Sequence, residues 1–132
     1  MSVSAFSVAG DATLSPISSL PFANGQTATC WVEISHDGQF LFAVNTGSGS
    51  ISRYSINPNG TLVSLGATPV RATGAVGAVD ARLSPDGATL FVDESRIGAV
   101  AAFAVNGGNL TELTNSPTSL PSGATPAGLV VN

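Results

Sequence analysis

Short stretches of alternating apolar and polar residues recur along the whole chain and predict β-strands. The stretch Ser50–Ile56 reads Ser-Ile-Ser-Arg-Tyr-Ser-Ile, an alternation with the period of two that gives a strand one buried face. Glycine, proline, asparagine or aspartate interrupts such stretches about every ten residues, which is too often for helices but suits tight turns. The pattern therefore predicts an all-β chain.

These strands belong to a repeat of about 49 residues. The sequence Ser-His-Asp-Gly at 35–38 returns as Ser-Pro-Asp-Gly at 84–87, an offset of 84 − 35 = 49, and each copy precedes an apolar strand. A strand centred on an aromatic residue occurs three times, at Phe6, Tyr54 and Phe103, with offsets of 48 and 49. A fixed period of this length indicates one supersecondary unit stacked against its own copies.

Each repeat is predicted to form four short strands joined by tight turns. The strands are expected at 29–35, 39–46, 50–57 and 63–70 in the complete repeat, and at 78–84, 88–95, 99–106 and 112–119 in the next. Partial repeats add strands at 2–9, 15–22 and 127–132. A four-stranded antiparallel meander with this period is typical of a β-propeller blade. We therefore predict one propeller segment, with a half blade at 1–25, full blades at 26–74 and 75–123, and the first strand of another blade at 124–132.

The blade motif resembles that of a known family. Ser-Pro-Asp-Gly with the following Thr-Leu-Phe-Val, and Ile-Ser-Arg-Tyr-Ser-Ile-Asn-Pro-Asn-Gly-Thr-Leu at 51–62, are similar to the repeats of lactonase-type seven-bladed propellers related to 6-phosphogluconolactonase. The stretch 120–132 resembles the carboxyl terminus of such proteins, where the last strand completes the first blade. The resemblance implies a segment of a lactone hydrolase that acts on a sugar lactone at the mouth of the propeller channel when the ring is complete.

Eleven predicted strands are too few for the seven blades that this family implies. They make about two and three-quarter blades, and such an incomplete ring leaves end faces and strand edges that need a covering surface. We therefore expect self-association through the open blade edges; a symmetric assembly, a domain-swapped assembly and a truncated fragment all stay open. The functional alternative is a non-catalytic, self-assembling propeller scaffold or binding module, natural or engineered.

The composition narrows the range of partners. Only 9% of the residues are charged, against roughly 25% in a typical soluble domain, and the net charge is −4. The four basic residues are all arginines, so no basic stripe is present to neutralise phosphates, and we expect no nucleic-acid partner. No apolar run approaches the length of about 18 residues that a membrane span needs, and no signal peptide is visible in the chain as given, so we expect a soluble protein.

Four residues on the predicted first strands are the candidates for a site. The first strand of each blade lines the central channel, and the repeat places Trp31 opposite Asp80 and Glu33 opposite Arg82. In the catalytic interpretation, Glu33 or Asp80 activates a water for attack on a lactone carbonyl, Arg82 stabilises the oxyanion, and Trp31 contacts the substrate. In the alternative interpretation, which we favour, Glu33 and Arg82 form an ion pair between neighbouring blades.

The histidine, the cysteine and the other charged residues, which could also take part in catalysis or binding, are interpreted as structural or solvent-exposed residues. His36 occupies a tight turn, and Cys30 lies in an apolar run, where a buried hydrophobic residue is expected rather than a nucleophile. Asp93 and Glu94 form a lone acidic pair that we interpret as exposed charge, and Arg53 and Arg96 are interpreted as solvated charges. The sequence contains no metal-site spacing of histidine and cysteine and no phosphate loop, so no metal or cofactor is expected.

Overall fold

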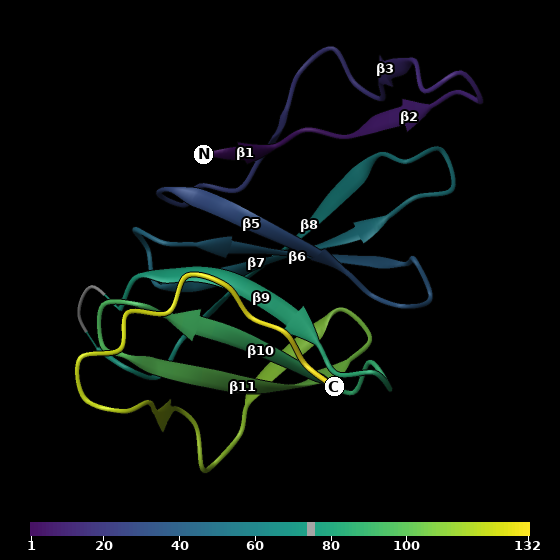
Figure 1. Cartoon of the computed structure of the whole chain (residues 1–132). Helices are drawn as coiled ribbons and strands as arrows, with labels where there is room; N and C mark the ends of the chain where they lie inside the picture. The colour runs from purple at the N-terminus through teal and green to yellow at the C-terminus, as the bar shows by residue number, and fades with distance from the viewer. Residues whose placement is uncertain (74–75) are drawn as a thin grey trace.

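The computed structural model of the chain describes residues 1–73 and 76–132, and the regular elements within these ranges are all β-strands. Figure 1 shows three layers: the amino-terminal strands lie above a first sheet, formed by residues 29–69, and a second sheet, formed by residues 78–119, lies below it. The blade boundary expected between residues 74 and 75 lies outside the described residues. The prediction of an all-β chain of four-stranded antiparallel meanders that do not close into a ring is confirmed.

The first sheet is a regular meander with strand order β5-β6-β7-β8. Its first turn shows why the repeated Ser-x-Asp-Gly sequence reverses the chain. The hydroxyl of Ser35 donates to Asp37 Oδ1 at 2.6 Å, the same oxygen accepts the backbone N–H of Gln39, and Gly38 takes a φ of +71° that favours glycine. The strands are β5 (Thr29–Ile34), β6 (Phe40–Asn45), β7 (Ser50–Ile56) and β8 (Leu62–Pro69).

The second sheet repeats this order and differs from the prediction at its outer strand. The expected strand at 112–119 is replaced by β12, which starts at Asn109, and a two-residue β13 that also pairs with β11. The reason is a tight turn at Gly107 and Gly108, because Asn106 already pairs with Asn109 and the hairpin closes earlier than the spacing suggested. The strands are β9 (Ala78–Leu83), β10 (Thr89–Glu94), β11 (Ala99–Asn106), β12 (Asn109–Glu112) and β13 (Thr118–Ser119).

The two ends of the chain are less regular than predicted. The amino-terminal strands expected at 2–9 and 15–22 are each split in two, giving β1 (Ser2–Val3), β2 (Phe6–Val8), β3 (Leu14–Pro16) and β4 (Phe22–Ala23). Between β3 and β4, Pro21 has no N–H for a ladder, and the Ser18 hydroxyl accepts the N–H of Leu20. Residues 127–132 do not form the expected strand; the N–H of Leu129 donates to a side chain of the second sheet, Asp80, rather than to a neighbouring strand.

Apolar side chains fill the spaces between the layers. The larger core joins the two sheets and is built around Phe42, Leu90 and Phe103, which are fully buried. The smaller core joins the first sheet to the amino-terminal strands through Val3 and Tyr54. These amino-terminal strands do not cover the inner strand β5, so on that face Val32 is 45% and Ile34 50% exposed.

Candidate functional site

An ion pair joins the inner strands of the two sheets. Arg82 on β9 donates from Nη1 to Glu33 Oε2 on β5 at 3.0 Å, and Glu33 Oε1 also accepts the backbone N–H of Leu83 at 3.3 Å. Glu33 faces the second sheet because its cross-strand partner Phe42 belongs to the core between the sheets. The two residues lie one repeat apart, so the pair links equivalent positions of successive blades.

The aromatic ring of Trp31 completes this cluster. The Arg82 guanidinium carbon lies 5.2 Å from the centroid of the Trp31 ring, within the range of a cation–π contact. Trp31 is 38% exposed and the Arg82 side chain 40% exposed, so both present surface to solvent while Glu33 is more deeply placed. Trp31, Glu33 and Arg82 are called the inner-strand cluster below.

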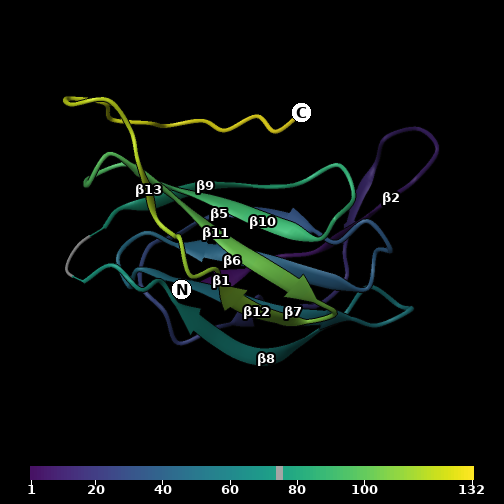
Figure 2. The same cartoon turned by 90° about the horizontal axis from the view of Figure 1, so that it is seen from below.

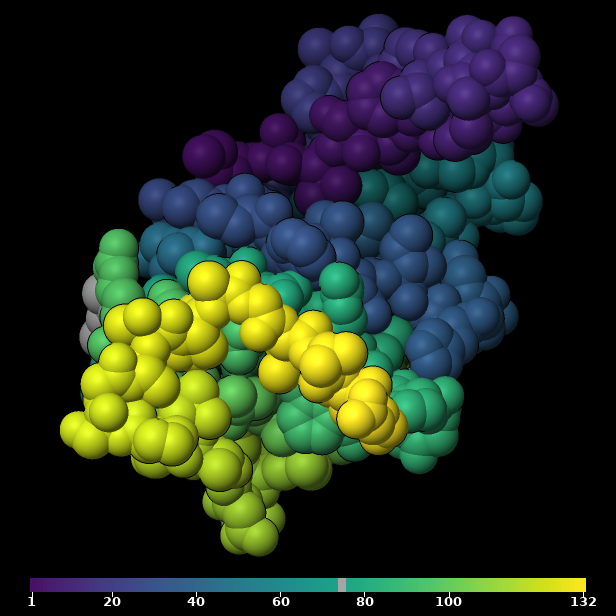
Figure 3. Space-filling model, viewed as in Figure 1, coloured from purple at the N-terminus to yellow at the C-terminus, as the bar shows by residue number. Residues whose placement is uncertain are grey.

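The hydrogen bonds of Asp80 go to backbone N–H groups rather than to the inner-strand cluster. Its Oδ1 accepts the N–H of Ala81 and its Oδ2 accepts the N–H of Leu129, each at 2.7 Å. Asp80 is buried, and the carboxy-terminal residues run alongside β9 in both views of the fold (Figures 1 and 2). The space-filling view also shows these residues lying across the second sheet (Figure 3). Asp80 therefore holds the carboxy-terminal segment against the second sheet, and its oxygens are engaged by backbone groups.

The prediction that Asp93 and Glu94 are exposed charges is wrong. Their side chains are 1% and 0% exposed, because β10 is an interior strand with β9 and β11 on either side. Burial, with the charge of Asp80 as a smaller cause, raises the pKa of Asp93, and burial with the charge of Glu112 raises the pKa of Glu94 to about 7. The repeat carried a signal for this, since Glu94 stands where the first sheet has the interior strand residue Asn45.

The predictions for four further residues are confirmed at two of them and wrong at the other two. Cys30 is exposed rather than buried, because it is the extra residue of a β-bulge between Thr29 and Trp31 on the uncovered strand β5. Arg53 is not simply solvated, since it donates to Gly108 O, Asn109 Oδ1 and Leu65 O and so bridges the sheets. His36 is an exposed turn residue, and Arg96 is exposed, as predicted.

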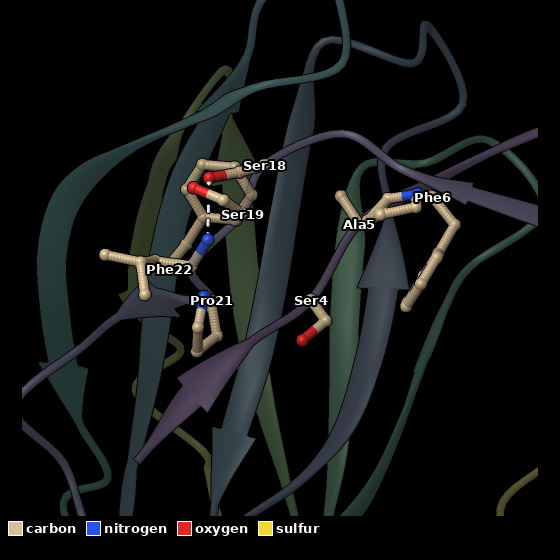
Figure 4. A pocket seen from close by; sticks show the side chains of 9 residues that line it. Ser4, Ala5, Phe6, Ser18, Ser19, Pro21 and Phe22 are labelled. Atoms are coloured by element: carbon tan, nitrogen blue, oxygen red, sulfur yellow. Dashed lines mark hydrogen bonds between the residues drawn. The ribbon is translucent and has the colours of Figure 1, made fainter.

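The amino-terminal layer contains a small cavity of about 120 Å³. Figure 4 shows its lining, which includes Phe6, Phe22 and the hydroxyls of Ser4, Ser18 and Ser19. None of the lining residues has a titratable side chain, so this cavity offers neither an acid, a base nor a charged ligand contact.

Within the described part of the chain, no group of three or more histidine, cysteine, aspartate or glutamate side chains is arranged to hold a metal ion. In the same residues, no helix has the length and apolar character needed to cross a bilayer.

Comparison with known proteins identifies fold neighbours but no sequence family. Neither a protein-family model nor a curated protein sequence matches the chain. Among solved structures, a candidate 6-phosphogluconolactonase from Bacteroides uniformis matches with a TM-score of 0.77 at 23% identity over 92% of this chain. A periplasmic gluconolactonase from Pseudomonas aeruginosa matches with a TM-score of 0.75 at 25% identity, again over 92% of this chain. The chain spans 37% of the length of each neighbour, and the match establishes a lactonase-like β-propeller fold.

Proposed function

We propose that this chain is a segment of a lactonase-like propeller, and that the inner-strand cluster forms part of a sugar-lactone hydrolysis site when the ring is complete. In this proposal residues 26–74 and 75–123 are complete blades, 1–25 is the outer half of the preceding blade and 124–132 starts the following one. The observation that carries the proposal is the contact among Glu33, Arg82 and Trp31 at the inner strands of neighbouring blades. The names of two fold neighbours, a gluconolactonase and a candidate 6-phosphogluconolactonase, support the substrate class.

Each member of the cluster suits one part of a sugar lactone. The half-exposed guanidinium of Arg82 can donate to a carbonyl oxygen or to an acidic substituent. The exposed ring surface of Trp31 can pack against the apolar face of a sugar ring. Glu33 accepts from both Arg82 and the Leu83 backbone, which fixes its carboxylate beside the position that the substrate would occupy.

The reaction proposed for this arrangement is hydrolysis of a cyclic ester. Glu33 takes a proton from water as the water oxygen bonds to the lactone carbonyl carbon, and Arg82 stabilises the negative charge that develops on the carbonyl oxygen. The bond between that carbon and the ring oxygen then breaks, and the proton on Glu33 passes to the ring oxygen. The product is the open-chain hydroxy acid, and Glu33 returns to its ionised state.

A binding and turnover experiment on the full chain tests the proposal. Trp31 is the only tryptophan, so its fluorescence reports directly on ligand binding at the cluster. Titration with glucono-δ-lactone and with gluconate should change the emission saturably, and acid release measured by pH-stat should exceed the spontaneous rate. Glu33→Gln should lower acid release by about a hundredfold or more while the fluorescence change persists.

The exposed Arg96 offers a matched control for Arg82. Arg82→Ala should abolish the saturable fluorescence change, whereas Arg96→Ala removes the same charge from an exposed position and should leave it intact. Spontaneous rates of acid release in all variants, together with no saturable binding in the wild-type chain at concentrations where it has self-associated, would contradict the proposal and favour the non-catalytic scaffold.

A further inference from the structure

Glu94 is an isolated carboxyl group inside the protein. Its side chain has no solvent exposure, and neither Oε1 nor Oε2 has a hydrogen-bond partner among the described residues. It lies at the end of β10, between Ala78 on β9 and Ala99 on β11. An ionised carboxylate in such a place is strongly disfavoured, because burial removes its hydration and nothing replaces it.

The repeat shows what the same position looks like when its polar groups are satisfied. Asn45, one repeat length earlier, is equally buried, and its side-chain amide donates to the hydroxyls of Ser50 and Ser52. Its oxygen accepts from the Thr29 hydroxyl and the Asn24 amide. Asn45 thus ties together β5, β6, β7 and the segment that enters the first sheet.

The second sheet lacks the hydrogen-bond partners that Asn45 has in the first sheet. At the positions equivalent to Thr29, Ser50 and Ser52, the sequence has alanine, at 78, 99 and 101. The three alanines are buried, so they form an apolar cage around Glu94. A neutral, fully satisfied amide in one blade therefore corresponds to an acidic, unsatisfied group in the next.

The charged groups around this cage do not neutralise Glu94. Glu112 on β12 is the acidic neighbour, and it is already engaged by the Arg71 backbone N–H and by the Ser116 hydroxyl. The Arg71 guanidinium donates to the backbone oxygens of Glu112, Thr114 and Ser116. On β9, Asp80 and Arg82 project from the opposite face to that of Ala81, which packs in the core, and β11 contains no charged residue. Arg96, in the turn after β10, is exposed.

We propose that Glu94 is a proton-controlled latch: it is protonated when the second sheet is closed, and its ionisation releases the segment that enters β9. This segment is held beside Glu94 by two backbone bonds, from Ser95 N to Gly77 O and from Arg96 N to Val76 O, each 3.0 Å long. Arg82 lies on β9, so release of the residues that enter this strand changes the backbone support of Arg82 and, with it, of the inner-strand cluster. The latch is independent of whether that cluster hydrolyses a lactone.

The sign of the pH effect follows from the environment of the carboxyl. The pKa of Glu94 is raised to about 7 in the folded chain, so the closed state holds a proton that the open state releases. Closure is then favoured most at low pH and is lost as pH rises through about 7. The opening equilibrium constant should increase by up to about tenfold per pH unit between about pH 5 and pH 7, and level off above.

Carbon-13 NMR of the side-chain carboxyl groups tests the protonation directly. The chain has only three glutamates, Glu33, Glu94 and Glu112, so each signal can be assigned by substitution. One glutamate signal should titrate near pH 7 in the wild-type chain and be missing from Glu94→Gln. If all three signals titrate in the ordinary range of about 4 to 5, the proposal is wrong.

Hydrogen exchange at the Ser95 and Arg96 amides tests the release. After correction for the intrinsic rate, their protection should fall with pH between 5 and 7 in the wild-type chain and in the control Asp11→Asn, which removes an exposed carboxyl from a turn of the amino-terminal layer. This fall should be much smaller in Glu94→Gln, where only Asp93 of the two buried carboxyls on β10 remains, and in a triple variant, Glu94→Asn with Ala99→Ser and Ala101→Ser, which supplies hydroxyl partners like those of Asn45. An unchanged pH dependence in either Glu94 variant would overturn the latch. If neither variant folds, the wild-type NMR titration still decides whether Glu94 holds a proton.

Discussion

Glu33 and Arg82 lie 49 positions apart in the sequence and 3.0 Å apart in space, so a single ion pair joins equivalent strands of two successive repeats. The pair lies at the inner edge of the interface between the two sheets, and the centre of that interface is apolar. Its arginine is 40% exposed, so water screens much of the attraction. The pair therefore positions side chains at the inner edge more than it stabilises the fold.

A double-mutant cycle measures how much the Glu33–Arg82 pair contributes to stability. We predict that Glu33→Gln, Arg82→Gln and the double variant have a coupling free energy below about 1 kcal/mol in urea unfolding, because exposed ion pairs contribute little. A coupling of several kcal/mol would mean that the pair is a main support of the blade interface.

Asn45 should be far more important for stability than this charged pair. Asn45→Ala removes a buried amide and leaves the hydroxyls of Thr29, Ser50 and Ser52 without it, so we predict a loss of about 2 to 4 kcal/mol in the free energy of unfolding. Asn57→Ala is the matched control, because Asn57 makes an exposed bond to Thr61 and should cost less than about 1 kcal/mol. Equal losses in the two variants would contradict the role of Asn45 as a buried hub.

The contrast between Asn45 and Glu94 also explains how much the sequence could predict. Period-two alternation and the 49-residue repeat predict the strands, their order and the pairing of Glu33 with Arg82, because these depend on local pattern and on equivalent positions. The burial of Glu94 was not predicted, since an acidic residue at a strand end usually lies in water. Asn45, one repeat earlier, carries the signal for this burial, because equivalent positions of stacked units share their burial even when their chemistry differs.

The early hairpin turn at residues 107–108 departs from the predicted spacing for a different reason. The offset of the repeat predicted the outer strand of the second sheet too late, at 112–119, whereas two adjacent glycines let the chain reverse at once. Local turn chemistry therefore overrode the spacing. The sequence pattern also does not predict that residues 127–132 cover the second sheet, since this arrangement depends on a hydrogen bond from the Leu129 backbone N–H to Asp80.

That bond leads to a prediction about the carboxy-terminal segment. Asp80→Ala should speed amide exchange at Leu129 and limited proteolysis within 124–132, while the free energy of unfolding of the two sheets changes little. The same substitution removes the negative charge that helps to raise the pKa of Asp93, so the pKa of Asp93 should fall towards its ordinary value. NMR titration of Asp93 with and without the substitution measures this fall, and an unchanged pKa would contradict the coupling.

The two Ser-x-Asp-Gly turns should control stability in acid. A serine hydroxyl, and then a backbone N–H, lowers the pKa of Asp37 and of Asp86 below 3.8. The folded chain thus binds fewer protons than the unfolded chain, so both turns stabilise it above that pKa and lose this effect as pH falls through the lowered values. We predict that Asp37→Asn with Asp86→Asn flattens the fall in urea midpoint between about pH 5 and pH 2. A double variant that keeps the full wild-type fall would show that other carboxyls cause it.

The uncovered face of β5 gives the last prediction, which concerns self-association. Val32 and Ile34 expose about half of their surface side by side on this strand, and apolar side chains exposed together favour association with another surface. We propose that the 132-residue chain associates with itself through this face. Sedimentation velocity should give a mass that rises with concentration, and Val32→Thr with Ile34→Thr should shift the chain towards the monomer. Val63→Thr is the control, because Val63 is 48% exposed on the outer strand β8, away from this face. A wild-type monomer at every concentration, or an equal shift with Val63→Thr, would contradict association through β5.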